Sequence, residues 1–206
     1  MTSADGKRLV VVTGTGTDIG KTYVTAALAR ALGARARKPV QSFDPTDEST
    51  DADVLAAATG EAVERVCPRH RWIPLPMAPP MAADALGLPA IKLVDLVREL
   101  DAPDTGITLV EGAGGLLSPL AHDGDTRDLI DACRPRAVVL VADAGLGTIG
   151  LVRLCAAALS TAPIVCMNRF DATDDLHRRN AAWLRTREGL EVVTDLEALA
   201  ARLRTS

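Results

Sequence analysis

Short apolar runs alternate with helical patterns along the chain. The valine-rich run at residues 9–13 favours a strand, since β-branched side chains are enriched in sheets. The alanine- and leucine-rich stretch at residues 22–32 predicts a helix directly after it. Further strands are expected at residues 36–40, 107–110, 137–142, 164–167 and 191–193, and further helices at residues 52–59, 81–86, 90–100, 148–159, 174–187 and 196–203.

This alternation predicts an α/β fold. It favours βαβ units with right-handed crossovers and a mostly parallel β-sheet flanked by helices. The sequence contains no internal repeat and no linker long enough to separate two domains. We therefore expect residues 1–206 to form a single domain.

Composition adds constraints on the core and on the partners. Hydrophobic residues make up 48% of the chain but aromatic residues only 2%, so the core must consist of Ala, Val, Leu and Ile, which suits helices on a buried parallel sheet. The net charge of −4 does not favour binding to nucleic acid or to an anionic membrane, which both attract positively charged proteins. The one basic stretch, residues 35–38, is short, and we interpret it as a solvated turn.

The cysteines and histidines form no metal-binding or disulfide pattern. The cysteines are scattered and are interpreted as small apolar fillers in a reducing cytosol. The sequence shows no signal peptide and no membrane span, so a cytoplasmic location is expected. The residues concerned are Cys67, Cys133, Cys155 and Cys166, and His70, His122 and His177, to which no role is assigned.

The most specific motif follows the first strand. Residues 14–22 read Gly-Thr-Gly-Thr-Asp-Ile-Gly-Lys-Thr and lead into the alanine-rich helix. A loop of this kind turns backbone N–H groups toward phosphate oxygens, and the helix N-terminus adds the positive end of a dipole. Lys21 is expected to reach the β- and γ-phosphates, and the Thr22 hydroxyl to hold Mg²⁺. Thr15 stands where the strict pattern has glycine; the alternative is a Gly/Thr-rich turn, which the order of strand, loop and helix disfavours.

Polar residues also follow other predicted strands, and open α/β sheets bind ligands outside the carboxyl ends of their strands. Glu111 ends a buried strand and is expected to be the second anchor for Mg²⁺, with a turn-capping role as the alternative. Lys38 precedes Pro39 and is either a surface charge or a cation that neutralises a carboxylate or phosphoryl group. Ser42 offers a hydroxyl on the same segment.

Three other polar residues have a structural interpretation beside a functional one. Asp51 and Asp53 lie at the predicted start of a helix, where capping is the default role of an aspartate. Asn168 ends a predicted strand, and its amide either reads an adenine edge or serves in a turn.

Together these segments resemble the dethiobiotin synthetase family of P-loop NTPases. The resemblance runs from residue 9 to about residue 170, and the combination of the glycine-rich loop with the Lys-Pro-Val and Val-Glu-Gly-Ala-Gly-Gly segments is specific. The matching segments are residues 14–22, 38–42, 51–52, 76–79, 110–115 and 146–149, and Asn168.

The resemblance implies a homodimeric, magnesium-dependent enzyme of biotin synthesis with ATP as co-substrate. Such enzymes capture CO₂ on an amine of 7,8-diaminononanoate as a carbamate. The carbamate then attacks the γ-phosphate, and the second amine closes a cyclic urea and expels phosphate. The implied partners are these small molecules and a second copy of the chain, with no nucleic acid and no membrane.

The resemblance also implies roles for the matching residues. Lys38, Lys21 and Thr17 are implied as catalytic, and Ser42, Lys38, Gly147 and Thr148 as substrate-binding. Thr22, Asp51 and Glu111 are implied as metal ligands. Of the two aspartates, Asp51 matches the family's metal ligand better than Asp53 by its spacing to Pro76. The implied nucleotide-binding residues are Gly16, Thr17, Asp18, Ile19, Gly20, Lys21, Thr22, Tyr23, Asp51, Glu111, Gly112, Ala113, Gly114, Asn168 and Arg169.

Three departures from the family pattern affect recognition. Phe43 stands where the family usually has glycine, so the loop that carries Ser42 can differ in shape. Gly150 stands where the family usually has asparagine, in a region that meets the substrate carboxylate across the dimer interface. Residues 192–195 replace the usual Ile-Pro segment over the nucleotide base, which leaves base selectivity open.

Two other function classes compete with this interpretation. A related P-loop amidoligase is expected to carry a glutamine-hydrolysing domain, for which the chain is too short. A nucleotide-switched partition ATPase typically has an additional lysine near the start of the loop, where this chain has Thr13-Gly14-Thr15.

Overall fold

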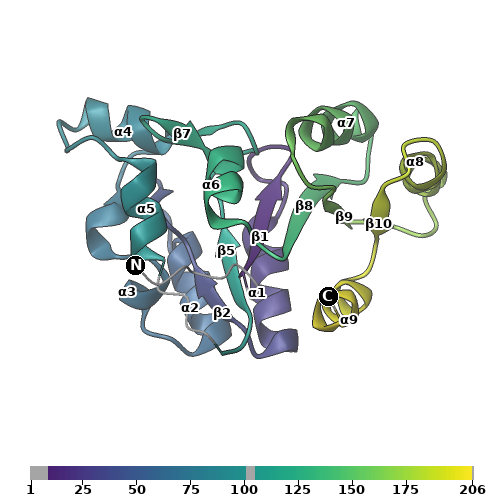
Figure 1. Ribbon diagram of the computed structural model, residues 1–206, viewed down its shortest axis with the longest axis horizontal. Helices are drawn as coiled ribbons and strands as arrows, with labels where there is room; N and C mark the ends of the chain where they lie inside the picture. The colour runs from purple at the N-terminus through teal and green to yellow at the C-terminus, as the bar shows by residue number, and fades with distance from the viewer. Residues whose placement is uncertain (1–8, 101–104, 206) are drawn as a thin grey trace.

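The computed structural model describes residues 9–100 and 105–205, and its centre is a six-stranded sheet (Figure 1). The strand order is β10-β9-β8-β1-β5-β2, and every pair of neighbours is parallel. This confirms the predicted α/β fold with a parallel sheet. The strands are β1 (Leu9–Gly14), β2 (Arg35–Arg37), β5 (Thr108–Glu111), β8 (Ala137–Asp143), β9 (Ile164–Asn168) and β10 (Glu191–Val193).

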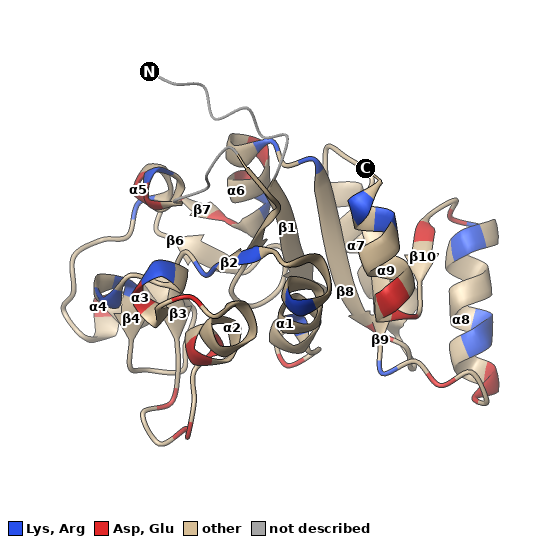
Figure 2. Ribbon diagram, turned by 90° about the horizontal axis from the view of Figure 1, so that it is seen from below, with Lys and Arg blue, Asp and Glu red and all other residues tan. Residues whose placement is uncertain are grey.

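Helices cover both faces of the sheet (Figures 1 and 2). Alternate valines of β1 point to opposite faces: Val10 and Val12 pack in the cluster that contains α1 and α9, and Val11 packs in the cluster that contains α5, α6, α7 and α8. Both faces of β1 are therefore buried from solvent, as expected for a central parallel strand. The helices are α1 (Lys21–Leu32), α5 (Leu93–Glu99), α6 (Thr126–Cys133), α7 (Thr148–Ala158), α8 (Asp175–Thr186) and α9 (Leu196–Arg204).

A smaller layer lies beside β2. It contains α2 (Asp51–Thr59) and α3 (Val63–Val66), which pack with α1 through Ala26, Ala52 and Leu55. Gly60 ends α2 with a φ of 73°, a backbone conformation that glycine adopts without strain. This layer places the N-terminus of α2 close to the start of α1.

The basic stretch at residues 35–38 is not the solvated turn that the sequence suggested. It forms β2 and the residue after it, and Arg37 and Lys38 are each only 2% exposed. Arg37 pairs with Glu61 at 2.9 Å, and Lys38 pairs with two carboxylates. The prediction was wrong because these partners are distant in sequence and approach only when α2 and β5 pack against β2.

Several elements were not predicted. The sequence pattern predicted no element in residues 116–136, where the chain forms a hairpin, β6 (Pro119–Ala121) and β7 (Gly124–Asp125), followed by α6. A capping box between Asp125 and Asp128 starts α6, so a local signal for this helix was present. The other unpredicted elements are β3 (Gln41–Ser42), α3, the 3₁₀ turn Arg69–Arg71, β4 (Trp72–Ile73) and the first residues of α4 (Pro79–Ala85).

The four cysteines are buried and unpaired, as expected for apolar fillers. Burial raises the pKa of the Cys67 and Cys166 thiols to about 12, which leaves them unreactive at neutral pH. Among the described residues, no helix combines the length and the apolar character that a membrane crossing requires.

Candidate active site

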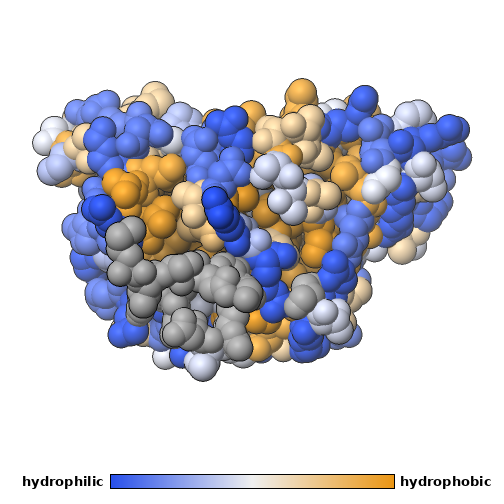
Figure 3. Space-filling view, in the orientation of Figure 1, coloured by the Kyte–Doolittle hydropathy of each residue, from blue (hydrophilic) through white to orange (hydrophobic). Residues whose placement is uncertain are grey.

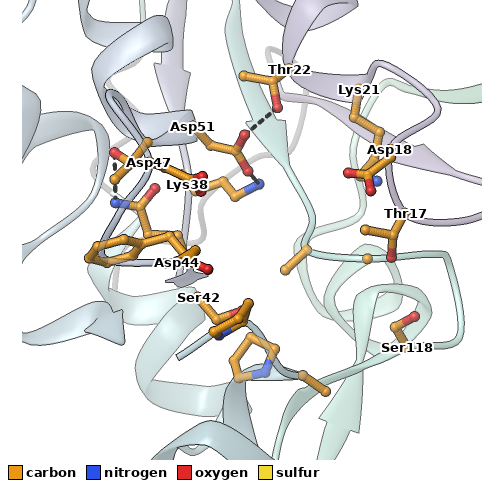
Figure 4. A pocket seen from close by; sticks show the side chains of 18 of the residues that line it. Thr17, Asp18, Lys21, Thr22, Lys38, Ser42, Asp44, Asp47, Asp51 and Ser118 are labelled. Carbon is orange, nitrogen blue, oxygen red and sulfur yellow. Dashed lines mark hydrogen bonds and ion pairs between the residues drawn. The ribbon is translucent and has the colours of Figure 1, made fainter. Parts of the chain in front are cut away.

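The loops at the carboxyl ends of β1, β2 and β5 surround a cavity of about 870 Å³ (Figure 4). Four segments with polar residues at predicted strand ends therefore lie at the same edge of the sheet. They are residues 14–22, 38–42, 111–115 and 168–169, the last of which follows β9. The lining residues include Thr17, Asp18, Gly20, Lys21, Thr22, Lys38, Ser42, Phe43, Asp51, Ala113, Gly114, Ser118 and Arg169.

The glycine-rich loop, residues 14–22, is held by two neighbouring loops. Leu116 donates its backbone N–H to the Gly14 carbonyl at 2.9 Å, and a Cβ on Gly115 would lie 3.4 Å from the Gly16 backbone. The backbone of Gly115 therefore lies close to the glycine-rich loop, and only a small side chain would fit at this position. Lys21 folds over the loop and donates Nζ to the Gly16 carbonyl at 2.8 Å.

Residues after β9 support the loop from the other side. Asn168 donates Nδ2 to the Ile19 carbonyl at 2.9 Å, and Arg169 donates Nη2 to the Asp18 carbonyl at 3.0 Å. Asn168 thus has a structural function that neither of its two sequence interpretations included. Arg169 has a φ of 56°, so its backbone is in the left-handed region.

A cluster of charged and hydroxyl groups lies behind the loop. Lys38 donates Nζ to Asp51 Oδ2 at 2.6 Å, to Glu111 Oε1 at 2.8 Å and to the Gly112 carbonyl at 3.2 Å. Thr22 Oγ1 lies 2.7 Å from Asp51 Oδ1 and 2.9 Å from Glu111 Oε1, and its one hydrogen serves one of them at a time. Figure 4 shows Lys38 and Asp51 meeting between Thr22 and Ser42.

Glu111 is fully buried, and its Oε2 has no hydrogen-bond partner among the described residues. A buried carboxylate oxygen without a partner carries the full cost of lost hydration. It can accept a further donor or ligate a cation. Of the alternatives stated for Glu111, turn capping accounts for none of its observed contacts.

The charged groups of this cluster shift one another's pKa values. Burial works against the ammonium of Lys38, but Glu111 and Asp51 outweigh it and hold the pKa of Lys38 above its usual value. Burial also opposes ionisation of Asp51, but Lys38 and the Thr22 hydrogen bond lower the pKa of Asp51 overall. Burial, followed by repulsion from Lys38, lowers the pKa of Lys21.

The two candidate aspartates have separate environments. Asp53 forms a capping box with Thr50, in which its Oδ2 accepts from the Thr50 backbone N–H at 2.9 Å. Asp51, two residues earlier, points instead to Thr22 and Lys38. The default capping role therefore applies to Asp53.

Further candidates line other parts of the same cavity. Ser42 donates Oγ to the Met77 carbonyl at 2.5 Å, and the Phe43 ring meets Trp72 edge to face at 5.8 Å. Thr17 is exposed at the cavity mouth opposite Ser118 (Figure 4). Acidic residues Asp44 and Asp47 lie on the loop between β3 and α2 and also line the cavity (Figure 4).

Gly147 and Thr148 do not line this cavity. They start α7, where Thr148 donates Oγ1 to the Asp143 carbonyl at 2.6 Å. Buried Asn180 donates Nδ2 to the carbonyls of Ala144 and Gly145, both at 2.9 Å, and so fixes the loop that leads into α7. Within one chain the structure does not bring this helix start to the other candidate residues.

A second cavity, of about 630 Å³, adjoins the glycine-rich loop at Gly20. It includes Tyr23 and Asn168, which were candidates, and Thr194 and Asp195, which the sequence proposed as a replacement for the family's segment over the base. No sequence motif indicated a ligand-binding role for the other lining residues, which include Phe170, Leu196 and Glu197.

We predict that Gly20→Ala destabilises the protein by about 1–3 kcal/mol, because Gly20 has a φ of 88° and a Cβ there would lie 2.1 Å from Asn168 Nδ2. Gly16→Ala is the matched control, since nothing lies within 4 Å of its Cβ and its φ is not positive. Urea denaturation of the ligand-free proteins measures both. Equal stabilities of the two variants would contradict the loop geometry.

Comparisons with known proteins agree with this geometry. A family model described as an AAA domain matches residues 8–200. The "ATP-dependent dethiobiotin synthetase BioD" of Caulobacter sp. (strain K31) is 43% identical over 180 residues, which cover 79% of this chain and 77% of the relative. The protein of the same name from Parafrankia sp. (strain EAN1pec) is 36% identical over 208 residues, covering 94% of this chain and 80% of the relative. This chain belongs to the ATP-dependent dethiobiotin synthetase family.

Proposed function

We propose that this chain catalyses the ATP-dependent carboxylation and ring closure of 7,8-diaminononanoate with CO₂ to form dethiobiotin. The observation that carries the proposal is the cluster of Lys38, Asp51, Glu111 and Thr22 directly behind a phosphate-binding loop. Family membership favours this activity over the amidoligase and partition ATPase alternatives. We further propose that residues 1–206 act as one catalytic domain and that the protein is cytoplasmic.

The loop geometry supports a nucleotide position across the two cavities. The triphosphate would lie along Gly16–Thr22, with Lys21 on the β- and γ-phosphates and the N-terminus of α1 behind them. The base would enter the second cavity, beside Tyr23 and Asn168. Backbone of residues 112–114 would approach from β5, and Arg169 borders both cavities.

The residues behind the loop fit Mg²⁺. Oxygens of Thr22, Asp51 and Glu111 converge, and hard oxygen donors are what this ion prefers. The buried, unpartnered Oε2 of Glu111 is an acceptor that a cation would satisfy. When bound, Mg²⁺ neutralises charge on the phosphoryl oxygens.

The side chains around the cavity suit the reaction chemistry. A carbamate and a triphosphate are both anions, so their approach requires cations, which Lys21 and Lys38 supply. The Thr17 and Ser42 hydroxyls are placed to orient a substrate amine or a carbamate oxygen. The carbamate oxygen would then attack the γ-phosphorus and displace ADP, which breaks the bond between the γ-phosphorus and the β–γ bridging oxygen. The second amine would attack the carbamoyl carbon of the resulting mixed anhydride, lose a proton and expel phosphate.

The start of α7 is proposed to bind the substrate carboxylate of a partner subunit in a homodimer. Leu146 is 93% exposed, and Leu151 and Leu154 on the same helix are also exposed. Figure 3 shows apolar surface over α7 next to hydrophilic neighbours. An exposed apolar face beside a proposed subsite fits an interface between copies, with Gly147 and Thr148 offering backbone N–H groups.

Turnover with ATP, Mg²⁺, bicarbonate and diaminononanoate tests the proposed activity. We expect dethiobiotin and ADP in equal amounts. Lys21→Ala should lower kcat by about 10²–10³-fold, because it removes a cation aimed at charge that grows in the transition state. Lys92→Ala, on the surface, is the control. A folded Lys21→Ala protein with normal turnover would refute the role of the loop, and absence of dethiobiotin from wild type would refute the function.

Asp51→Asn should raise the Mg²⁺ concentration required for half-maximal turnover, since it removes a charged ligand. Asp53→Asn should leave this midpoint unchanged and lower the free energy of unfolding by about 1 kcal/mol, because it weakens the capping box. Magnesium titrations of activity and urea denaturation of both variants provide the comparison. A shifted midpoint in Asp53→Asn alone would reverse the assignment.

Gly150 has no side chain with which to bind a carboxylate. We therefore expect wild type to discriminate weakly between diaminononanoate and its methyl ester. Nothing lies within 4 Å of a Cβ at Gly150, so Gly150→Asn should fit and increase this discrimination about tenfold, as one hydrogen bond to a charged group does. The ratio of the KM values for diaminononanoate and for its methyl ester measures this discrimination in each protein. Strong discrimination by wild type would contradict the prediction.

A further inference from the structure

The Lys38 ammonium is fully occupied by protein acceptors. It has three hydrogens, and three oxygens lie within reach: Asp51 Oδ2 at 2.6 Å, Glu111 Oε1 at 2.8 Å and the Gly112 carbonyl at 3.2 Å. Its side chain is only 2% exposed. In this position Lys38 has no hydrogen left for a carbamate or a phosphoryl oxygen.

The same two carboxylates are those that fit Mg²⁺ in the proposed function. Glu111 Oε1 is shared, since it accepts from Lys38 and also lies 2.9 Å from Thr22 Oγ1. A divalent cation on Asp51 and Glu111 would lie within a few ångströms of the ammonium and repel it. Glu111 Oε2, buried and without a partner, remains as an additional oxygen for the incoming ion.

The surroundings of Lys38 allow its side chain to move without its backbone. The Lys38 backbone N–H donates to the Val66 carbonyl at 2.8 Å, and Pro39 restricts the chain that follows. Lys38 also borders the 870 Å³ cavity, whose lining residues do not include Glu111. A rotation about its side-chain bonds would carry the ammonium toward this cavity while the backbone stays in place.

We propose that Lys38 and the divalent metal exchange at this carboxylate pair: Lys38 is the internal counter-ion of Asp51 and Glu111, and metal binding releases its ammonium into the cavity. The inference rests on the metal site of the proposed function. It deepens that function by making Lys38 available to the carbamate and the γ-phosphate only after the metal is bound.

Amine labelling of the wild-type protein tests the exchange directly. The chain has four lysines, Lys7, Lys21, Lys38 and Lys92, so acetylation at each is readily separated by peptide mass spectrometry. The protein is saturated with ADP, which fills the loop without a γ-phosphate, and is labelled with acetic anhydride in EDTA or in Mg²⁺. Metal binding is measured in parallel by calorimetry.

We expect Mg²⁺ to increase the acetylation rate of Lys38 about tenfold or more, since a buried group becomes accessible. The increase should follow the calorimetric binding curve. Lys92, which is exposed, is the internal reference and should not change. An unchanged or lower Lys38 rate at saturating Mg²⁺, or no saturable Mg²⁺ binding, would overturn the proposal.

A variant provides a second measurement. Lys38→Met removes the competing cation, so Mn²⁺, followed by electron paramagnetic resonance, should bind about tenfold more tightly than to wild type. Lys92→Met is the matched control and should match wild type. Unchanged or weaker Mn²⁺ binding by Lys38→Met would contradict the exchange.

Simple repulsion without exchange would also tighten Mn²⁺ binding by the variant, so the labelling result separates the two. If Lys38→Met does not fold without metal, the labelling of wild type decides. Neither measurement uses diaminononanoate or CO₂. A failure to form dethiobiotin and a failure of the exchange are therefore distinguishable.

Discussion

The ion cluster of buried Lys38 and Glu111 with half-exposed Asp51 is the constraint on which the rest of the site depends. It joins the segment after β2, the start of α2 and the end of β5, which are far apart in the sequence. The ammonium of Lys38 and the carboxylate of Glu111 are buried and carry a large desolvation cost, and removal of either partner leaves an uncompensated buried charge. The cluster is therefore weak evidence for stability and strong evidence for function, because hydrophobic side chains would hold these elements together at lower cost.

The parallel sheet makes this cluster possible. Parallel strands end at the same edge, so the loops after β1, β2 and β5 lie close together, and hydrogen bonds such as that from the Leu116 N–H to the Gly14 carbonyl join them. The glycines after Glu111 then allow close approach: Gly115 lies against the Gly16 backbone, and Gly112 lies against the Thr126 side chain, whose Cγ2 would be 2.7 Å from a Cβ. A side chain at position 112 would clash with Thr126 and displace the segment after β5 or the start of α6.

Features encoded over a few residues could be predicted from the sequence. The strand-loop-helix order around Lys21, the buried strand before Glu111 and the alternation of elements are local patterns, and the structure contains them. Features that need distant partners could not be predicted. The burial of Arg37 depends on Glu61, and the pairing of β3 with β4 joins residues about 30 positions apart. The different hydrogen-bond partners of Asp51 and Asp53 depend likewise on the packing of α2 beside α1, although the family resemblance already favoured Asp51 as the metal ligand.

The pKa values of the two lysines at the site are shifted in opposite directions. The pKa of Lys21 is lowered by burial and by Lys38, whereas the carboxylates hold the pKa of Lys38 above its usual value. The two ammonium groups and the carboxylates of Asp51 and Glu111 sum to no net charge, so these four groups alone provide little attraction for a triphosphate. Backbone N–H groups of the loop and the start of α1 supply the field that the side chains cancel. A cation that neutralised the two carboxylates would leave both lysines uncompensated, and the same four side chains would then form a strongly positive site for the phosphates and the carbamate.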